Sequence, residues 1–171
     1  MKLLKRLMII IASVCLLCGC TKSNIISPEA DENLPQPGAD GIVWEQLWDD
    51  FREVYEDTDI YPFIETVNGG VYPEENMIRF FLLTNTEISG EEAAEYATEV
   101  LKGFNDLISE QNSSFAPSSE DSYGGYVSKH DIYVMVSPDD GKGENANWIL
   151  EDTIPAGEYR EVDPEAVPVV E

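Results

Sequence analysis

The chain has 171 residues, of which 34 are acidic and 10 are basic, so its formal net charge is −24. A nucleic-acid-binding surface needs clustered Lys and Arg to release counterions from phosphate, and this composition excludes one. Anionic lipid headgroups would repel the same charge, so we expect no protein face to bind a bilayer. Hydrophobic residues make up 43% of the chain, which is enough for the core of one domain.

The chain begins with a basic segment and continues with an apolar one. Met1–Arg6 carries three positive charges, and residues 7–17 carry no charge. This order is typical of the n-region and h-region of a signal peptide. The apolar run is shorter than the about 20 residues that a membrane span needs.

The apolar run ends in Leu17-Cys18-Gly19-Cys20, an aliphatic residue followed by small residues and a cysteine. This ending resembles the lipobox of bacterial lipoproteins. The resemblance covers about the first 20 residues and implies cleavage between Gly19 and Cys20, with residues 1–19 as the signal peptide. It further implies that Cys20 carries diacylglycerol, with fatty acyl chains such as palmitate, and anchors the protein to a membrane.

All three cysteines of the chain lie in this region, and their positions argue against other roles. Cys15 and Cys18 have the spacing of a redox pair, but they lie in an apolar targeting segment and not at the start of a folded helix, where a thiol pKa is lowered. A zinc site needs about four ligands, and the single histidine, His130, lies far along the chain. We therefore expect no disulfide, metal or cofactor in the mature domain.

A tether is predicted to follow the anchor. Residues 20–41 contain three prolines and few apolar side chains, and about twenty flexible residues span on the order of 25 Å. Cleavage after Gly19 would remove three basic residues and no acidic ones, which leaves 7 basic against 34 acidic residues and a net charge of −27. A single domain is expected over residues 42–160, with an acidic tail over residues 161–171.

The first half of the domain shows helical spacing and then two apolar runs. Five large apolar residues recur at intervals of three and four and predict an amphipathic helix over residues 42–56: Trp44, Leu47, Trp48, Phe51 and Tyr55. Residues 60–67 are typical of a strand, with a turn at residues 68–70. Residues 77–83 form a nearly continuous apolar run, which indicates a central strand.

The second half repeats the series of one helix and two strands. Ser89 and Glu92 have the spacing of a capping box, and apolar residues follow at helical period to about Glu110. A loop over residues 111–123 precedes strands predicted at residues 132–136 and 147–150, with a turn-rich connection between them. A further short edge strand is expected near Tyr159.

The predicted fold class is α+β, in the order helix, strand, strand, helix, strand, strand. We expect an antiparallel sheet of four to five strands with both helices on one face. Gly69-Gly70 and Gly124-Gly125 are 55 residues apart, and each pair precedes an aromatic residue, a polar segment and an apolar run. A duplicated helix-plus-hairpin unit is one interpretation, and glycine turns that commonly precede strands are the other.

Catalytic signals in the sequence are weak. His130 would need an orienting carboxylate and a nucleophile to act as a general base, but Asp131 would point to the opposite face of a strand. We therefore expect a solvent-facing histidine. The sequence contains no nucleophile-elbow motif, phosphate-binding glycine loop or zinc-protease motif.

Abundant carboxylates leave two chemical alternatives open. A glycosidase-type pair of carboxylates is compatible with the composition, but no particular pair stands out. Residues 139–145 provide oxygen ligands beside glycines, as a calcium loop does, without the alternating acidic spacing of that loop. A solvated hairpin loop is the favoured interpretation of this segment.

Aromatic residues are the remaining signal. A binding face could be built from rings near the Gly-Gly pairs, because aromatic side chains supply contact area at low entropic cost. The alternative is cross-strand pairing within the sheet. The candidate ligand-binding residues are Tyr123, Tyr126 and Trp148.

Together these features predict a bacterial cell-envelope lipoprotein. We expect the lipid on Cys20 to hold it in the cell membrane or outer membrane, with the domain facing outside the cytoplasm. The domain is expected to bind or scaffold an extracellular or periplasmic protein or glycan, rather than to catalyse a reaction. The alternatives are an envelope hydrolase with two carboxylates and a calcium-dependent binding module.

Overall fold

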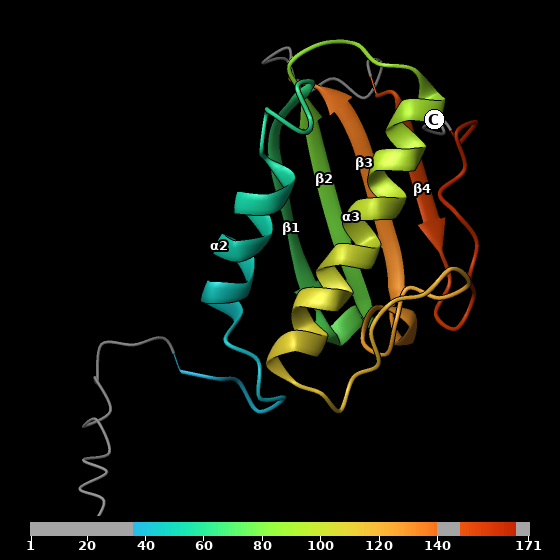
Figure 1. The fold of residues 1–171 in the computed structure, drawn as a ribbon. Coiled ribbons are helices and arrows are strands. Elements are labelled where there is room, and N and C mark those ends of the chain that lie inside the picture. Colours follow the sequence, from blue (N-terminus) through green and yellow to red (C-terminus); the bar gives the residue numbers. More distant parts are fainter. Residues whose placement is uncertain (1–35, 140–147, 167–171) are drawn as a thin grey trace, which may run out of the picture. The chain divides into compact units, whose positions relative to one another are not determined.

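A computed structural model describes residues 36–139 and 148–166 (Figure 1). The predictions for the signal peptide, the lipobox, most of the tether and most of the calcium-like segment lie outside these residues. The described helices and strands occur in the order α2 (Trp44–Tyr55), β1 (Ile64–Tyr72), η2 (Pro73–Glu75), β2 (Met77–Thr84), α3 (Gly90–Gln111), η3 (Val127–Lys129), β3 (Asp131–Pro138) and β4 (Leu150–Ile154). The α+β class is confirmed, and the order differs from the predicted one by the two short 3-10 helices.

The four strands form one sheet in the order β1-β2-β3-β4. β1 pairs antiparallel with β2 and β3 pairs antiparallel with β4, but β2 and β3 are parallel. The prediction of an antiparallel sheet is therefore wrong at its centre. A helical crossover returns the chain to the end of the sheet where β2 began, so the next strand runs parallel to it. Two apolar strands separated by a helix were the sequence signal for this pairing.

Both helices cover the same face of the sheet, as Figure 1 shows. Phe80 of β2 contacts Phe51 of α2 and Phe104 of α3, with ring centroids 6.0 and 5.1 Å apart. The predicted apolar face of α2 is confirmed in part: Leu47, Phe51 and Tyr55 are buried, whereas Trp44 and Trp48 are half-buried. Burial of these rings between the helices and the sheet removes large apolar side chains from water, which is the main favourable contribution to folding.

The start of α3 follows the predicted capping pattern. The Ser89 hydroxyl accepts a hydrogen bond from the backbone N–H of Glu92 at 3.1 Å. This bond satisfies one of the free donors of the first helical turn. The predicted helix from Ser89 to about Glu110 agrees with the observed Gly90–Gln111.

The turn predicted at residues 68–70 is wrong, because these residues lie inside β1. The chain turns at η2 and Asn76 instead, where Asn76 has a positive φ of 51°. A Cβ on Gly69 would clash with the carbonyl oxygen of Arg79 and lie 3.0 Å from the Trp48 ring. Glycine is therefore needed for close packing within a strand and not for a turn.

The two Gly-Gly pairs also occupy different structures. Gly69 and Gly70 are in β1, whereas Gly124 and Gly125 lie in the loop before η3. Gly124 has a φ of +88°, and a Cβ there would clash with the Asn105 side chain. The similarity of the two segments thus reflects separate local requirements and not a common structural unit.

Residues 158–166 pack on the domain, although the sequence assigned residues 161–171 to a tail. Val162 is buried, and the N–H of Glu151 in β4 donates to the carbonyl oxygen of Ala166 at 3.0 Å. The strand expected near Tyr159 is absent from the described residues, where Tyr159 instead packs on Tyr123 with ring centroids 5.2 Å apart. This segment covers the outer edge of β4, which would otherwise expose unpaired backbone groups.

Candidate functional site

The concave regions of the described surface include one in which three of the six lining residues are aromatic, and we call it the aromatic pocket. It has a volume of about 290 Å³, and it contains a single charged side chain. Its lining residues are Asp40, Trp44, Trp48, Val71, Pro73 and Tyr126. Largely apolar pockets with a few polar groups are the usual form of ligand sites.

Separate elements bring these rings together. Trp44 and Trp48 lie one turn apart at the start of α2, so they share a helical face. Tyr126 is the residue before η3, and its ring centroid lies 5.8 Å from that of Trp44 at an interplanar angle of 59°. The two rings therefore form an open corner and not a parallel stack.

Tyr126 is held in place by one buried side chain and two half-buried rings. The fully buried Asn105 of α3 accepts hydrogen bonds from the backbone N–H of Tyr126 at 2.9 Å and of Val127 at 3.3 Å. The rings of Phe115 and His130 lie 5.1 and 4.8 Å from the Tyr126 ring. This support fixes the ring before any ligand arrives, and preorganisation of this kind reduces the entropic cost of binding.

Asp40 supplies the negative charge of the aromatic pocket. Its Oδ1 accepts the backbone N–H of Ile42 at 3.1 Å, and its carbonyl oxygen accepts from the side chain of Asn112 at 2.7 Å. Burial, and to a lesser extent the charge of Asp40, raises the pKa of Tyr126 to about 12. The phenol is therefore neutral at physiological pH.

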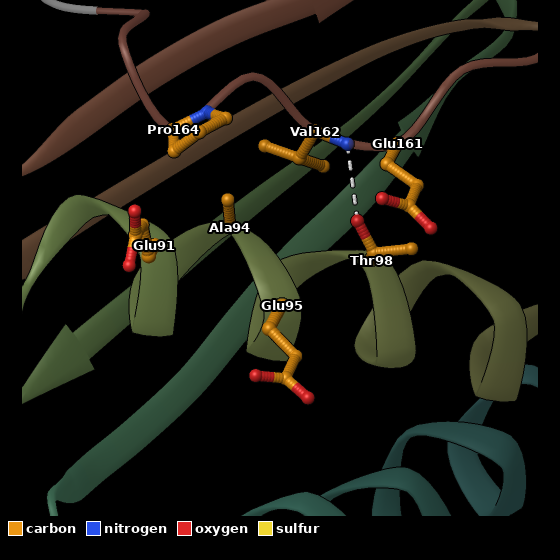
Figure 2. Close-up of a pocket in the computed structure, with 7 residues that line it drawn as sticks. All are labelled: Glu91, Ala94, Glu95, Thr98, Glu161, Val162 and Pro164. Atoms are coloured by element: carbon orange, nitrogen blue, oxygen red, sulfur yellow. Dashed lines mark hydrogen bonds between the residues drawn. The ribbon is translucent and has the colours of Figure 1, made fainter.

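A second concave region, of about 350 Å³, lies between α3 and the C-terminal segment (Figure 2). Glu91, Glu95 and Glu161 line it together with Ala94, Thr98, Val162 and Pro164. The three carboxylates are exposed to solvent, whereas a catalytic general acid needs a desolvated carboxyl. This region therefore lacks the environment that the hydrolase hypothesis requires.

A third region carries both aromatic and acidic side chains and has a volume of about 220 Å³. It is lined by Tyr61, Phe63, Glu92, Glu95, Tyr96 and Glu99. The Tyr61 hydroxyl donates to a carboxylate oxygen of Glu99 at 2.9 Å. No group of three or more acidic, His or Cys side chains within residues 36–139 and 148–166 is arranged to hold a metal ion.

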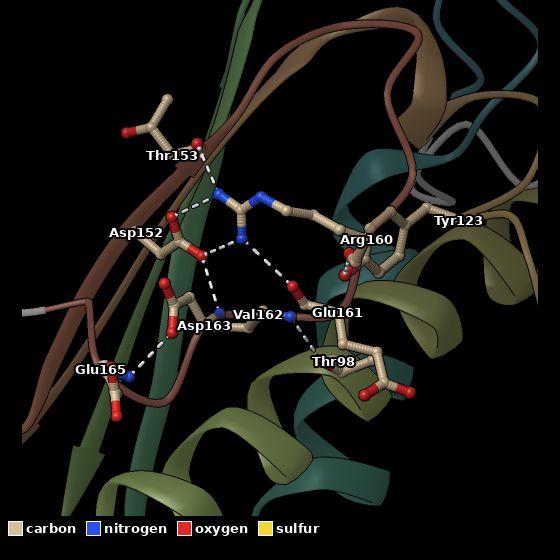
Figure 3. Close-up of polar contacts among 9 residues, drawn as sticks. All are labelled: Thr98, Tyr123, Asp152, Thr153, Arg160, Glu161, Val162, Asp163 and Glu165. Atoms are coloured by element: carbon tan, nitrogen blue, oxygen red, sulfur yellow. Dashed lines mark hydrogen bonds and ion pairs between the residues drawn. The ribbon is translucent and has the colours of Figure 1, made fainter.

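The buried carboxylate of Asp152 accepts hydrogen bonds that link β4 to the C-terminal segment (Figure 3). Arg160 donates to its two oxygens at 2.6 and 2.7 Å, and the N–H of Asp163 donates at 3.0 Å. Burial alone would raise the pKa of Asp152, but these hydrogen bonds outweigh it and lower the pKa. Asp152 is thus an ionised partner that ties the C-terminal segment to β4, and it lacks the raised pKa of a general acid.

The residues predicted as ligand-binding are separated in the structure. Tyr126 lines the aromatic pocket, whereas Tyr123 is 0% exposed and its hydroxyl donates to the carbonyl oxygen of Arg160 at 2.7 Å. Trp148 is half-buried before β4 and is not among the residues that line the aromatic pocket. Trp44 and Trp48 were assigned to the helix core from their spacing, but both are only half-buried.

His130 is not solvent-facing as predicted. Its ring is half-buried against Tyr126, and its Nδ1 lies 3.0 Å from the carbonyl oxygen of Tyr126. The carboxylate of the neighbouring Asp131 accepts the backbone N–H of Ala156 at 2.8 Å. His130 therefore helps to position Tyr126.

No family model matches this chain, and the searches found neither a curated protein nor a solved structure that is similar to it. Among the residues that the structure describes, no helix has the length and apolar character needed to cross a bilayer.

Proposed function

We propose that the protein is a bacterial cell-envelope lipoprotein whose acidic domain binds an envelope partner in the aromatic pocket without catalysing a reaction. The observation that carries the binding role is the supported corner of Trp44 and Tyr126, which opens into a concave region. Aromatic rings at the centre of a recessed surface are typical of sites that dominate binding energy.

Membrane attachment rests on the lipobox-like ending at Cys20. The intact mass of protein extracted from membranes tests it directly. We expect a chain that begins at Cys20 and carries a diacylglycerol, and a Cys20→Ser variant that keeps residues 1–19 and loses the lipid. Cys18→Ser is the matched control and should be processed normally. A free thiol at Cys20 with residues 1–19 still attached would contradict the anchor.

The binding role can be tested in intact cells with a photo-crosslinking amino acid. Placed at Pro73, on the exposed rim of the aromatic pocket, it should give a discrete adduct with the partner. The matched control is Tyr72, the last residue of β1, which is also exposed but does not line the aromatic pocket. Val71 of β1 lines the pocket, and neighbouring strand residues point to opposite faces, so the label at Tyr72 should give none of that adduct.

The mass of the adduct and its protease sensitivity distinguish a protein partner from a glycan. The adduct from Pro73 should disappear when Trp44 is replaced by Ala. Equal labelling from both positions, or labelling that survives Trp44→Ala, would rule out the aromatic pocket as the binding site.

A further inference from the structure

The aromatic pocket offers a potential ligand two kinds of contact, the faces of aromatic rings and one carboxylate. Trp and Tyr rings attract a cation that lies within about 6 Å of the ring centre. The rings of Trp44 and Tyr126 are 5.8 Å apart and tilted by 59°, so a group seated in their corner lies close to both rings. The geometry therefore suits a compact charged group better than a flat ring stacked between two others.

The charge of the pocket also favours a positively charged ligand. Asp40 is its single charged lining residue, and Oδ1 of the carboxylate accepts the backbone N–H of Ile42. The five basic side chains that the structure describes do not line the pocket: Arg52, Arg79, Lys102, Lys129 and Arg160. Within residues 36–139 and 148–166, no basic side chain of the pocket lining would therefore compete with an incoming cation for this carboxylate.

We propose that the aromatic pocket binds a basic side chain, Lys or Arg, presented by a protein partner. This inference rests on the proposed function and names the chemistry of its ligand. A neutral sugar would leave the charge of Asp40 without a counter-charge, whereas a basic side chain would pair with it. The net charge of −24 also favours a basic protein, because opposite charges accelerate encounter over distances beyond direct contact.

The indole N–H signals of the domain provide a direct assay by NMR. The chain has three tryptophans, of which Trp44 and Trp48 line the pocket and Trp148 does not. The probes are the capped peptides Gly-Gly-Lys-Gly-Gly and Gly-Gly-Arg-Gly-Gly, with Gly-Gly-norleucine-Gly-Gly as a neutral control of similar length. We expect the basic peptides to shift the Trp44 and Trp48 signals and to leave the Trp148 signal unchanged.

Two variants separate the contribution of the Asp40 charge to binding from that of the Trp44 ring. Asp40→Asn should weaken binding of the basic peptides by about five- to tenfold, in the range expected for a partly desolvated charge pair. Trp44→Ala should weaken it by about tenfold, and Trp148→Ala should leave it unchanged. Far-UV circular dichroism of each variant confirms that the domain is folded.

Several outcomes would overturn the inference. Equal shifts with the norleucine peptide would show that the pocket selects apolar bulk and not charge. Unchanged affinity in Asp40→Asn together with an unchanged salt dependence would exclude a contact between the ligand and the Asp40 carboxylate. A photo-crosslinked partner that lacks a basic residue at the contact, or a glycan, would refute this inference while the proposed binding function stands. Absence of both the adduct and the peptide shifts would refute both.

Discussion

Replacement of Asp152 by Asn tests whether the C-terminal segment is held by an ion pair. The carboxylate is 7% exposed and accepts two hydrogen bonds from Arg160 and one from the N–H of Asp163. Loss of a hydrogen bond to a charged group costs roughly 1.5–3 kcal/mol. The Arg160 side chain is 40% exposed and can regain water, so we expect Asp152→Asn to lower the free energy of unfolding by about 2 kcal/mol.

Urea unfolding, followed by tryptophan fluorescence, measures this loss at pH 7. The matched control is Asp49→Asn, which breaks an ion pair to Arg52 in which the Asp49 side chain is 72% exposed. Exposed pairs contribute about 0–1 kcal/mol, so the control should change stability by less than about 0.5 kcal/mol. A loss in Asp152→Asn no larger than in the control would refute the structural role of the pair.

The pH dependence of the stability difference between the natural protein and Asp152→Asn supplies an independent test. The pKa of Asp152 is lowered in the folded state from its usual 3.8. A carboxyl with a lowered pKa stabilises the fold above the unfolded-state value and loses that contribution as the pH falls through the folded-state value. The stability difference between the natural protein and Asp152→Asn should therefore be constant at neutral pH and shrink below about pH 3.8. A difference that grew on acidification would contradict the assignment.

Three further substitutions test the fold. Gly69→Ala places a Cβ against the Arg79 carbonyl oxygen and should lower the free energy of unfolding by about 1–3 kcal/mol in urea titrations. Ser89→Ala removes the N-cap hydroxyl of α3 and should cost about 1 kcal/mol in the same assay. In Gly103→Ala the new Cβ would clash with the Tyr55 hydroxyl, where α2 packs on α3. Alanine is favoured over glycine in a helix by about 1 kcal/mol. The clash should cost more than this gain, so the variant should be less stable than the natural protein.

Each of these substitutions has its own control. The three atoms nearest to a Cβ on Gly70 all belong to the Tyr72 side chain, the nearest at 3.3 Å, so Gly70→Ala should cost less than Gly69→Ala. Ser89→Asp keeps an N-cap acceptor and should restore stability. In a Tyr55→Ala background, Gly103→Ala should become stabilising, since only the propensity gain remains. A Gly103→Ala loss that is the same in both backgrounds would contradict the proposed clash.

Local patterns predicted the helices well because a helix is defined by neighbours along the chain. The spacing from Trp44 to Tyr55 predicted the buried face of α2, and the Ser89 cap predicted the start of α3. The apolar run at residues 77–83 predicted the central strand β2. In each case the periodicity records which side of a single element is buried.

Local patterns could not predict that Gly69 lies inside a strand, or that β2 and β3 run parallel. Gly69 is required by Trp48 and by the carbonyl of Arg79, which approach from α2 and β2. The parallel pairing of β2 with β3 depends on where the α3 crossover returns the chain. Both depend on contacts between residues that are distant in sequence, whereas turn propensity reports only on local conformation.

By itself, the sequence determined the acidic character, the α+β class, the two helices with their buried faces and the expectation of a lipid anchor at Cys20. Tertiary structure alone decided which aromatic residues share a pocket. Tyr123 and Tyr126 are three positions apart, yet one is enclosed by the C-terminal segment and the other faces Trp44. The physical reason is that a pocket is a property of the space between elements, and the identity of a residue does not specify which element will lie opposite to it.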